Sequence, residues 1–341
     1  MRHQRLRATA PVAWLLFLAT AATAQAPTVA EIVGNISQSS YTSYLQDYLY
    51  AHNGDNRGNG PQHDLARNNI QSFFQSFGLQ TTLHSFVYNG TTYYNVIGML
   101  QGTTRPNEYL VLGAHFDSVN NPGADDNGSG TAGVLEAARV LSQYTFERTI
   151  IFAAFDREEQ GLKGSTAWVN DHSTWDIRGM VSLDMIGFNP SGSAHDTALI
   201  YGRGSSDPLK TALSGAVSTY GAINCTVLGQ LDASDHAPFE WKGYQAALLI
   251  EGAVWSNPNY HKPTDSVDTP NYLDYDYATR MTKGSAGWLA SSATPVGRRD
   301  THPVPEFGTL VAFAFGSGSL CLYILRLRCA RPARRRGYVH S

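Results

Sequence analysis

The sequence predicts an α/β fold, a three-layer α/β/α sandwich with a central, mostly parallel mixed sheet. Short apolar runs, which are typical of strands buried on both faces of a sheet, recur along the chain. They occupy residues 109–114, 149–155, 180–184, 198–201 and 246–250. Helical patterns alternate with these runs, as at 131–144 and 208–220. Strands that alternate with helices favour a largely parallel sheet covered by helices on both faces.

The N-terminal part of the chain adds helices and a hairpin to this pattern. We expect helices at 28–49 and 63–77, separated by a loop at 53–61 that is rich in Asn and Gly. Two runs, 80–88 and 92–99, flank Asn89-Gly90 and predict a β-hairpin. No internal repeat is visible. We therefore predict one domain at 25–290, followed by a linker at 291–306 that contains Ser, Thr and Pro.

The composition restricts the possible classes of function. Of the 341 residues, 42% are hydrophobic, which is enough for a large core, and only 16% are charged. The net charge of −3 conceals two basic ends, because three arginines precede residue 8 and six follow residue 325. The remaining chain holds 16 of the 25 basic residues and all 28 acidic ones. This acidic body argues against a nucleic-acid partner and is compatible with carboxylates that bind metal.

The first 24 residues have the pattern of a signal peptide. A basic start is followed by an apolar stretch at 12–19 and by small residues up to Ala24. The alternative is a buried N-terminal helix, but the apolar stretch is too short to span a bilayer and has the flanks of an export signal. The sequence therefore predicts an exported protein.

The C-terminal end predicts anchoring. Residues 307–325 contain no charge and are about long enough to cross a membrane, and the basic tail at 326–341 follows directly. Three glycines weaken this stretch as an isolated helix, so a core helix is the alternative. Val304-Pro305-Glu306-Phe307 before it resembles a prokaryotic C-terminal sorting signal, which implies processing by a sortase-like enzyme. We expect a secreted or cell-surface protein held by a transmembrane or sorting segment.

Residues that can bind metal follow the predicted strands. In open α/β sheets, functional groups gather beyond the carboxyl ends of the strands. Four strand ends deliver histidines and carboxylates to that edge, and the loop before a helix at residue 131 adds two more acids. The residues are His115 and Asp117, Asp125 and Asp126, Glu158 and Glu159, Asp184, and Tyr260-His261. The pattern predicts a metal site in a catalytic domain at 25–290.

The residue types favour zinc. Zinc accepts imidazole nitrogen and carboxylate oxygen, and a site without thiolates is expected to be catalytic and open. Two histidines, one bridging carboxylate and two terminal carboxylates can hold two metal ions. One carboxylate then remains without a metal and is free to act as a base. Such a pair of ions lowers the pKa of a shared water and binds both the attacking and the leaving oxygen.

Six ordered motifs between residues 109 and 265 carry a family resemblance. They lie at 113–118, 123–130, 158–165, 182–185, 234–239 and 260–265. Together they resemble the co-catalytic di-zinc aminopeptidase family, of the bacterial leucyl-aminopeptidase type. The resemblance implies a fold of the zinc-exopeptidase (phosphorylase/hydrolase-like) type. It also implies two Zn²⁺ ions per chain and hydrolysis of the N-terminal peptide bond of peptides with a free N-terminus.

The resemblance also implies a role for each site residue. Asp126 bridges the two zinc ions, His115 and Asp184 complete one site, and Glu159 and His261 complete the other. Glu158 is the general base. The peptide bond between Asp126 and Asn127 is expected to be cis.

The neighbouring residues have less certain functions on sequence grounds. His-x-Asp spacing allows Asp117 to orient His115, and Tyr260 can polarise the scissile carbonyl, although a surface acid and ordinary packing are the alternatives. We expect Asp125 to be a solvated loop acid. Asp235 and His236 are expected to be hydrogen-bonded supports beneath the site.

Three other functions remain open. A glutaminyl-peptide cyclase resembles this family but uses one zinc ion, and the motif at 158–165 favours the aminopeptidase. A dipeptidase or carboxypeptidase of the same fold is the second alternative. A non-catalytic binding module is the third, but such modules usually lack metal ligands or the base, and every expected ligand is present here.

Overall fold

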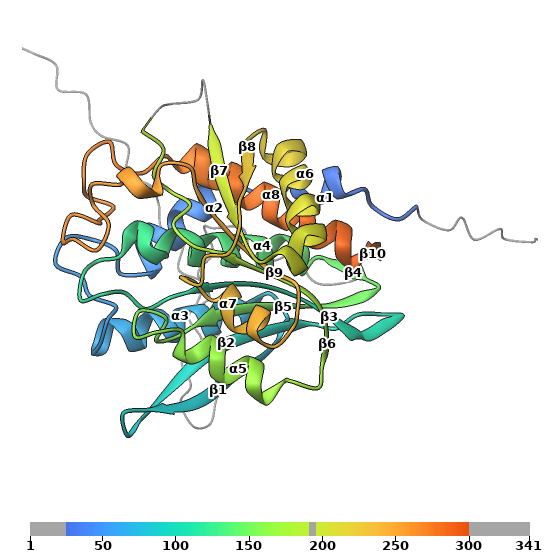
Figure 1. Ribbon diagram of the computed structural model, residues 1–341, viewed down its shortest axis with the longest axis horizontal. Helices are drawn as coiled ribbons and strands as arrows, with labels where there is room; N and C mark the ends of the chain where they lie inside the picture. The colour runs from blue at the N-terminus through green and yellow to red at the C-terminus, as the bar shows by residue number, and fades with distance from the viewer. Residues whose placement is uncertain (1–24, 191–195, 300–341) are drawn as a thin grey trace, which may run out of the picture.

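The computed structural model describes residues 25–190 and 196–299, and an eight-stranded sheet lies at its centre (Figure 1). The strand order is β1-β2-β5-β3-β6-β9-β7-β8. The strands are β1 (Gln80–Tyr88), β2 (Thr91–Leu100), β3 (Arg105–His115), β5 (Arg148–Phe155), β6 (Asp176–Leu183), β7 (Thr197–Tyr201), β8 (Asn224–Val227) and β9 (Ala246–Glu251). The order is not sequential, so several connections pass over a face of the sheet to reach a strand that is not the next in the chain.

The central strands are parallel and the outer ones are mixed. β5, β3, β6 and β9 run parallel to one another. The hairpin β1–β2 joins the sheet antiparallel to β5, and β7 is antiparallel to β9 but parallel to β8. The predicted mostly parallel mixed sheet and the hairpin at Asn89-Gly90 are therefore confirmed. The carboxyl ends of the four central strands meet at one edge.

Helices cover both faces of the sheet, which confirms the three-layer sandwich (Figure 1). One face carries α5 (Lys163–Asp171) and α7 (His236–Trp241). The opposite face carries α1 (Val29–Val33), α2 (Gln38–Ser43), α3 (Pro61–Ser76), α4 (Gly130–Leu141), α6 (Asp207–Gly221) and α8 (Tyr275–Ala293). Shorter helical turns are η1 (Tyr44–Tyr48), η2 (Ala124–Ser129), η4 (Gly204–Ser206) and η5 (Val254–Ser256).

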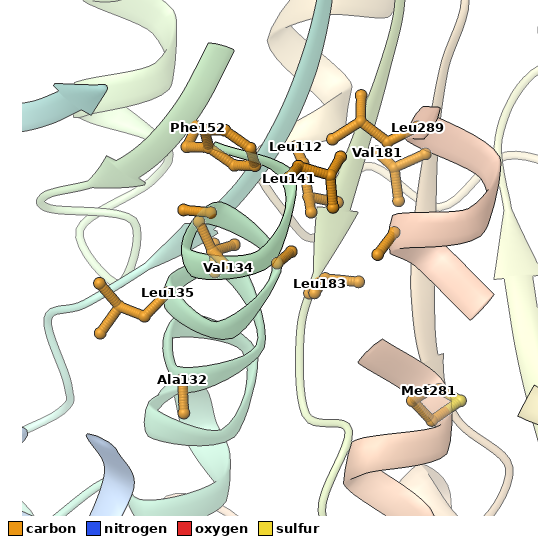
Figure 2. Close-up of a cluster of buried hydrophobic side chains, with 14 of the residues drawn as sticks. Leu112, Ala132, Val134, Leu135, Leu141, Phe152, Val181, Leu183, Met281 and Leu289 are labelled. Carbon is orange, nitrogen blue, oxygen red and sulfur yellow. The ribbon is translucent and has the colours of Figure 1, made fainter. Parts of the chain in front are cut away.

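The core lies on both faces of the central strands, and β3 shows why. Its successive side chains point to opposite faces. Leu110 and Leu112 join the large cluster beneath α4 and α8, whereas Val111 joins the smaller cluster beneath α5 and α7. Figure 2 shows the larger cluster, in which Leu112 and Val181 of the sheet lie close to side chains of the covering helices. Burial on both faces fixes the strand ends that carry the functional residues.

The predicted helix at 28–49 is divided into three short pieces. α1 ends at Val33 with Gly34 as its C-cap, and Ser37 caps α2 because its hydroxyl accepts a hydrogen bond from the amide of Ser40. η1 follows without a break. The helix predicted at 63–77 begins earlier, at Pro61, because proline is well suited to the first turn of a helix.

The fold continues into the range that the sequence assigned to a linker. α8 extends to Ala293 and is followed by β10 (Pro295–Arg298). This strand pairs antiparallel with the short strand β4 (Tyr144–Phe146), away from the main sheet. Residues 291–298 therefore belong to the globular domain, because their backbone hydrogen bonds are made within it.

The expected membrane anchoring must be corrected. No helix among residues 25–190 and 196–299 is both long and apolar enough to cross a membrane. The longest of these helices, α8, has 19 residues but carries Asp276, Arg280 and Lys283. The segment 307–325 on which the expectation rested lies outside the described residues, as do the predicted signal peptide at 1–24 and the basic tail at 326–341. A surface localisation through a membrane anchor is not supported.

Candidate metal centre

Three central strands bring their metal-type residues to one edge of the sheet. His115 is the last residue of β3, Asp184 follows the last residue of β6, and Glu158 lies three residues beyond β5. The Nε2 atom of His115 lies 3.5 Å from a carboxylate oxygen of Asp184 and 3.9 Å from one of Glu158. The parallel register of these strands places the three side chains together.

Asp126 lies between two histidines. One of its carboxylate oxygens is 3.4 Å from Nε2 of His115, and the other is 3.0 Å from Nε2 of His261. Nε2 of His261 also lies 3.3 Å from a carboxylate oxygen of Glu159. Each oxygen of Asp126 therefore faces a different half of the site, which is the arrangement that a bridging carboxylate needs.

The turn η2, which carries Asp126, depends on the glycine that precedes it. Gly123, just before the turn, has φ 59°, which L residues with side chains rarely adopt. A Cβ atom at Gly123 would lie 2.5 Å from the carbonyl oxygen of Asp126, closer than real Cβ atoms come to another atom. The peptide bond between Asp126 and Asn127 is cis, as the resemblance implies.

The tautomer of His115 is set by its surroundings. Its Nδ1 atom lies 3.1 Å from the backbone carbonyl oxygen of Asp117, which can only accept a hydrogen bond. Nδ1 therefore carries a proton, and Nε2, which faces Asp126 and Asp184, is the nitrogen that can lose its proton and offer a lone pair to a metal ion. This is the tautomer that a histidine needs to bind a metal ion through Nε2.

Asp117 contacts His115 through its backbone and the glutamates through its side chain. Its carboxylate accepts hydrogen bonds from the backbone amides of Glu158, at 3.1 Å, and Glu159, at 3.4 Å. The carboxylate is 3.6 Å from Nδ1 of His115. Asp117, which is completely buried, therefore fixes both the imidazole and the loop that carries the two glutamates.

Tyr260 and His261 are the exposed members of the site. Their rings stack at a centroid distance of 3.8 Å. The side chain of His261 is 38% exposed, whereas that of His115 is 1% exposed. Tyr260 is also partly exposed to solvent.

Burial of many carboxylates together shifts their pKa values. Burial raises the pKa of Glu158 well above its usual range and that of Glu159 to about 7, and it also raises the pKa of Asp184. Burial acts to raise the pKa of Asp126 too, but hydrogen bonds with the two histidines bring it down to about 2. Hydrogen bonds with Asp126 and Glu159 raise the pKa of His261 to about 10. A buried cluster of this kind stabilises positive charge.

The residues present fit a metal ion. The ligand atoms of His115, Asp126 and Glu159 all lie within 4.8 Å of one another, as do those of His115, Glu158 and Asp184. Among the residues that the structure describes, the second carboxylate oxygen of Glu159 is buried and has no hydrogen-bond partner. Nitrogen and carboxylate donors without thiolates suit a catalytic zinc site.

The comparisons with known proteins agree with this geometry. The model of peptidase family M28 matches residues 95–287, which include every residue of the candidate centre. The chain belongs to this family. The resemblance inferred from the sequence motifs is therefore confirmed.

The M28 chain is similar to several aminopeptidases and peptidases. It is 30% identical over 307 residues to leupeptin-inactivating enzyme 1 of Streptomyces exfoliatus, an alignment that covers 82% of this chain and 66% of that enzyme. The chain spans about two thirds or less of the length of the first curated relatives that it matches.

Solved structures support the fold. The LapA aminopeptidase of Legionella pneumophila superimposes with a TM-score of 0.67 at 23% identity, over 78% of this chain and 74% of that one. BSAP, a zinc aminopeptidase from Bacillus subtilis, superimposes with a TM-score of 0.54 at 27% identity, over 61% of this chain and 52% of that one. These likenesses confirm the fold type of the M28 chain.

One expectation about the surroundings of the centre differs from the structure. Asp125, expected to be a solvated loop acid, is completely buried, and burial raises its pKa to about 6. Its carboxylate accepts hydrogen bonds from the amide of Gly187 and the side chain of Asn257. Asp235 and His236 are buried as expected, and burial raises the pKa of Asp235 overall to about 7 although hydrogen bonding with Ser165 lowers it.

Sequence reasoning missed two buried residues that hold the loops of the M28 centre. The guanidinium of Arg57 donates to backbone carbonyls on both sides of the site, including those of Phe116, Pro122 and Gly123. Asp265 accepts hydrogen bonds from the amides of Asp125 and Asp126. Arg57 lies in the loop predicted at 53–61 and Asp265 in the motif at 260–265, but neither pattern shows which backbone groups the side chain meets.

Proposed function

We propose that the protein is a zinc-dependent aminopeptidase that hydrolyses the N-terminal peptide bond of peptides with two zinc ions. The observation that carries this proposal is the position of Asp126, whose two oxygens face His115 and His261 separately. A single ion needs only one of these oxygens. A pair of ions accounts for both histidines and for the acid beside each of them, Asp184 and Glu159.

Each residue then has a distinct role. His115 and Asp184 hold one ion, Glu159 and His261 hold the other, and Asp126 is shared. Bound zinc lowers the pKa of water and polarises a carbonyl. The carboxylate of Glu158 lies 3.9 Å from Nε2 of His115, and burial raises its pKa well above the usual range. Its position lets it take a proton from the attacking water and deliver that proton to the departing amine.

Two further residues position these groups. Asp117 holds the backbone of Glu158 and Glu159 and fixes the tautomer of His115. Tyr260, exposed and stacked on His261, can donate its hydroxyl proton as a hydrogen bond to the oxygen of the scissile carbonyl. Partial desolvation and, after it, the negative charges of Asp126 and Asp184 raise the pKa of this hydroxyl, so it stays protonated at neutral pH.

The choice of the N-terminal bond rests on the relatives. The Legionella and Bacillus proteins are named aminopeptidases. The metal geometry explains hydrolysis of an amide bond but does not by itself select the end of the substrate. We therefore propose peptides with a free N-terminus as substrates.

Zinc content and substrate end can be tested together. Purified protein is expected to hold two zinc ions by elemental analysis, to release the chromophore from amino-acid anilides and to lose this activity with a chelator. N-terminally blocked substrates are expected to be resistant. Cyclisation of an N-terminal glutamine peptide with one ion bound would favour a glutaminyl cyclase instead, and hydrolysis of blocked peptides would favour a carboxypeptidase.

The role of Glu158 requires a separate variant. Glu158→Gln keeps the shape of the side chain but removes its ability to accept a proton. We expect turnover to fall about 10²- to 10⁴-fold while two zinc ions remain bound. Since Glu158 also lies within ligand distance of His115 and Asp184, loss of one ion in this variant would make it a ligand rather than the base.

A further inference from the structure

Asp265 contacts three consecutive backbone amides in the turn that carries Asp126. Its carboxylate accepts from the amide of Asp125 at 2.7 Å and from that of Asp126 at 3.1 Å, one through each oxygen. Its own backbone carbonyl accepts from the amide of Ala124 at 3.1 Å. No part of Asp265 is exposed to solvent. A single buried residue therefore satisfies every backbone donor from Ala124 to Asp126.

Asp265 also belongs to the loop that carries His261. The three residues between them are held in a compact turn, because the amide of Lys262 donates to the carbonyl of Asn259 and the amide of Asp265 donates to the carbonyl of Lys262. The position of Asp265 therefore limits the position of His261. The side chain of His261 is 38% exposed, and its ring contacts Tyr260 by stacking and Asp126 and Glu159 through Nε2.

The two halves of the centre differ in what determines the distance between their metal-binding side chains. His115 and Asp184 stand at the ends of neighbouring strands, so the sheet determines the distance between them. Asp126 and His261 both lie on loops, and neither loop is part of the sheet. The bonds from Asp265 to the amides of Asp125 and Asp126 join these two loops directly. Asp117 holds the loop of Glu158 and Glu159 in the same way, because its carboxylate accepts hydrogen bonds from the backbone amides of both residues.

We propose that Asp265 is a positioning residue that sets the distance between Asp126 and His261 and so forms the more exposed of the two metal sites. The proposal rests on the two-zinc function proposed above. Without the carboxylate of Asp265, the turn of Asp126 is free to move relative to His261. The ion held by His261 and Glu159 is then weakened most, because the opposite ion keeps two ligands that the sheet fixes.

The test compares Asp265→Asn with Tyr272→Phe. Asparagine has the size of aspartate but directs an NH₂ group at one of the two backbone amides, so that bond is lost and two donors face each other. Tyr272→Phe is the matched control, because the Tyr272 hydroxyl donates to the same carboxylate at 3.1 Å and belongs to the same buried cluster. This change removes a partner of Asp265 without touching its bonds to Asp125 and Asp126.

Zinc binding is the first measurement. In Asp265→Asn we expect one of the two ions to bind about 10- to 100-fold more weakly, in competition with a chromogenic chelator, and the visible spectrum of the cobalt-substituted protein to change. In Tyr272→Phe we expect a lower melting temperature but the affinities and spectrum of the unaltered protein. If both variants lose zinc in proportion to their loss of stability, Asp265 acts only through folding, and the proposal is overturned.

Amide hydrogen exchange on the metal-free protein separates this proposal from the proposed function. Exchange in a peptide containing residues 124–126 is expected to be faster in Asp265→Asn than in Tyr272→Phe. Equal exchange in the two variants would refute the positioning role whatever the zinc content. If the unaltered protein binds a single zinc ion, the two-zinc function fails, while faster exchange in Asp265→Asn still establishes that Asp265 holds the turn of Asp126.

Discussion

The two histidines of the candidate centre stand in contrasting environments. His115 ends a strand in the middle of the sheet, is almost completely buried and has its tautomer fixed by the carbonyl of Asp117. His261 lies on a loop after β9, is more than one third exposed and adopts φ 57°. Both face the same carboxylate, Asp126.

This contrast shows how one site can combine a rigid half with an accessible half. The sheet holds His115 and Asp184 whether or not a metal is bound, because their backbones belong to neighbouring strands or follow them directly. The half with His261 and Tyr260 is open to solvent, which a substrate needs. The open half must obtain its order from bonds between loops, and those bonds can be broken singly by mutation.

Replacement of each histidine by alanine should give the largest difference. In metal-free protein, His115→Ala leaves two buried carboxylates, Asp126 and Asp184, and the largely buried Glu158 without their partner. We expect it to lower the free energy of unfolding by about 3 kcal/mol. His261→Ala removes a partly exposed partner and is expected to cost about 1 kcal/mol or less. Urea unfolding in the presence of a chelator measures both.

Hydrolysis provides the control for this pair. Both variants are expected to lose turnover of an amino-acid anilide, because each removes a proposed zinc ligand. The contrast between the halves disappears if the two variants lose equal stability, or if His261→Ala is the less stable.

Replacement of Arg57 is expected to give the second-largest loss of stability. Its guanidinium is completely buried and donates to the carbonyls of Phe116, Pro122 and Gly123, next to both His115 and the turn of Asp126. Lysine keeps the charge but cannot reproduce the planar fork of donors. We expect Arg57→Lys to lower the free energy of unfolding by about 2 kcal/mol, since buried carbonyls lose their donors.

Arg178→Lys is the matched control for Arg57→Lys. Arg178 is half exposed and pairs with the exposed Asp176, so its replacement is expected to change stability by less than about 0.5 kcal/mol. If the two substitutions lower the free energy of unfolding equally, the buried guanidinium of Arg57 does not hold these loops.

The sequence was sufficient to predict which residues gather at the centre. His115, Glu158 and Asp184 follow strands that are recognisable from apolar runs, and the carboxyl ends of parallel strands must meet at one edge. Asp126 and His261 follow from the same rule, whereas their roles as metal ligands came only from the family resemblance. The burial of Asp125 and the bonds of Asp265 could not be predicted, because they depend on how two loops 140 residues apart pack together.

The fold was predictable where periodic patterns are long. The central strands and the helices α4 and α6 were recognised, but β4, β8 and β10 have only three or four residues and give no periodic signal. The break of the first predicted helix has a local cause in Gly34 and Ser37, yet helical spacing continues across it. α8 is rich in Gly, Ala and Ser, so its apolar face is weak although it is mostly buried.

The smallest expected effect concerns a surface ion pair that also joins the accessible half to the rest of the protein. Nδ1 of His52 lies 2.9 Å from a carboxylate oxygen of Asp268, in the loop that follows His261. This hydrogen bond raises the pKa of His52 above its usual 6.5, and the nearby Asp55 adds to the shift. A raised pKa in the folded state means that the pair stabilises the fold fully below about pH 6.5. The stabilisation is lost as the pH rises through the folded-state pKa of His52.

Asp268→Asn should therefore bring the pKa of His52 back toward 6.5, as measured by NMR titration of its imidazole. Because both side chains are at least 40% exposed, solvent and salt screen the interaction, and raising the salt concentration of the unaltered protein should shift the pKa in the same direction. Zinc affinity in Asp268→Asn is expected to stay within about twofold, since an exposed pair contributes little to the position of the loop. A large loss of zinc in this variant would mean that the exposed pair, and not Asp265 alone, determines the position of His261.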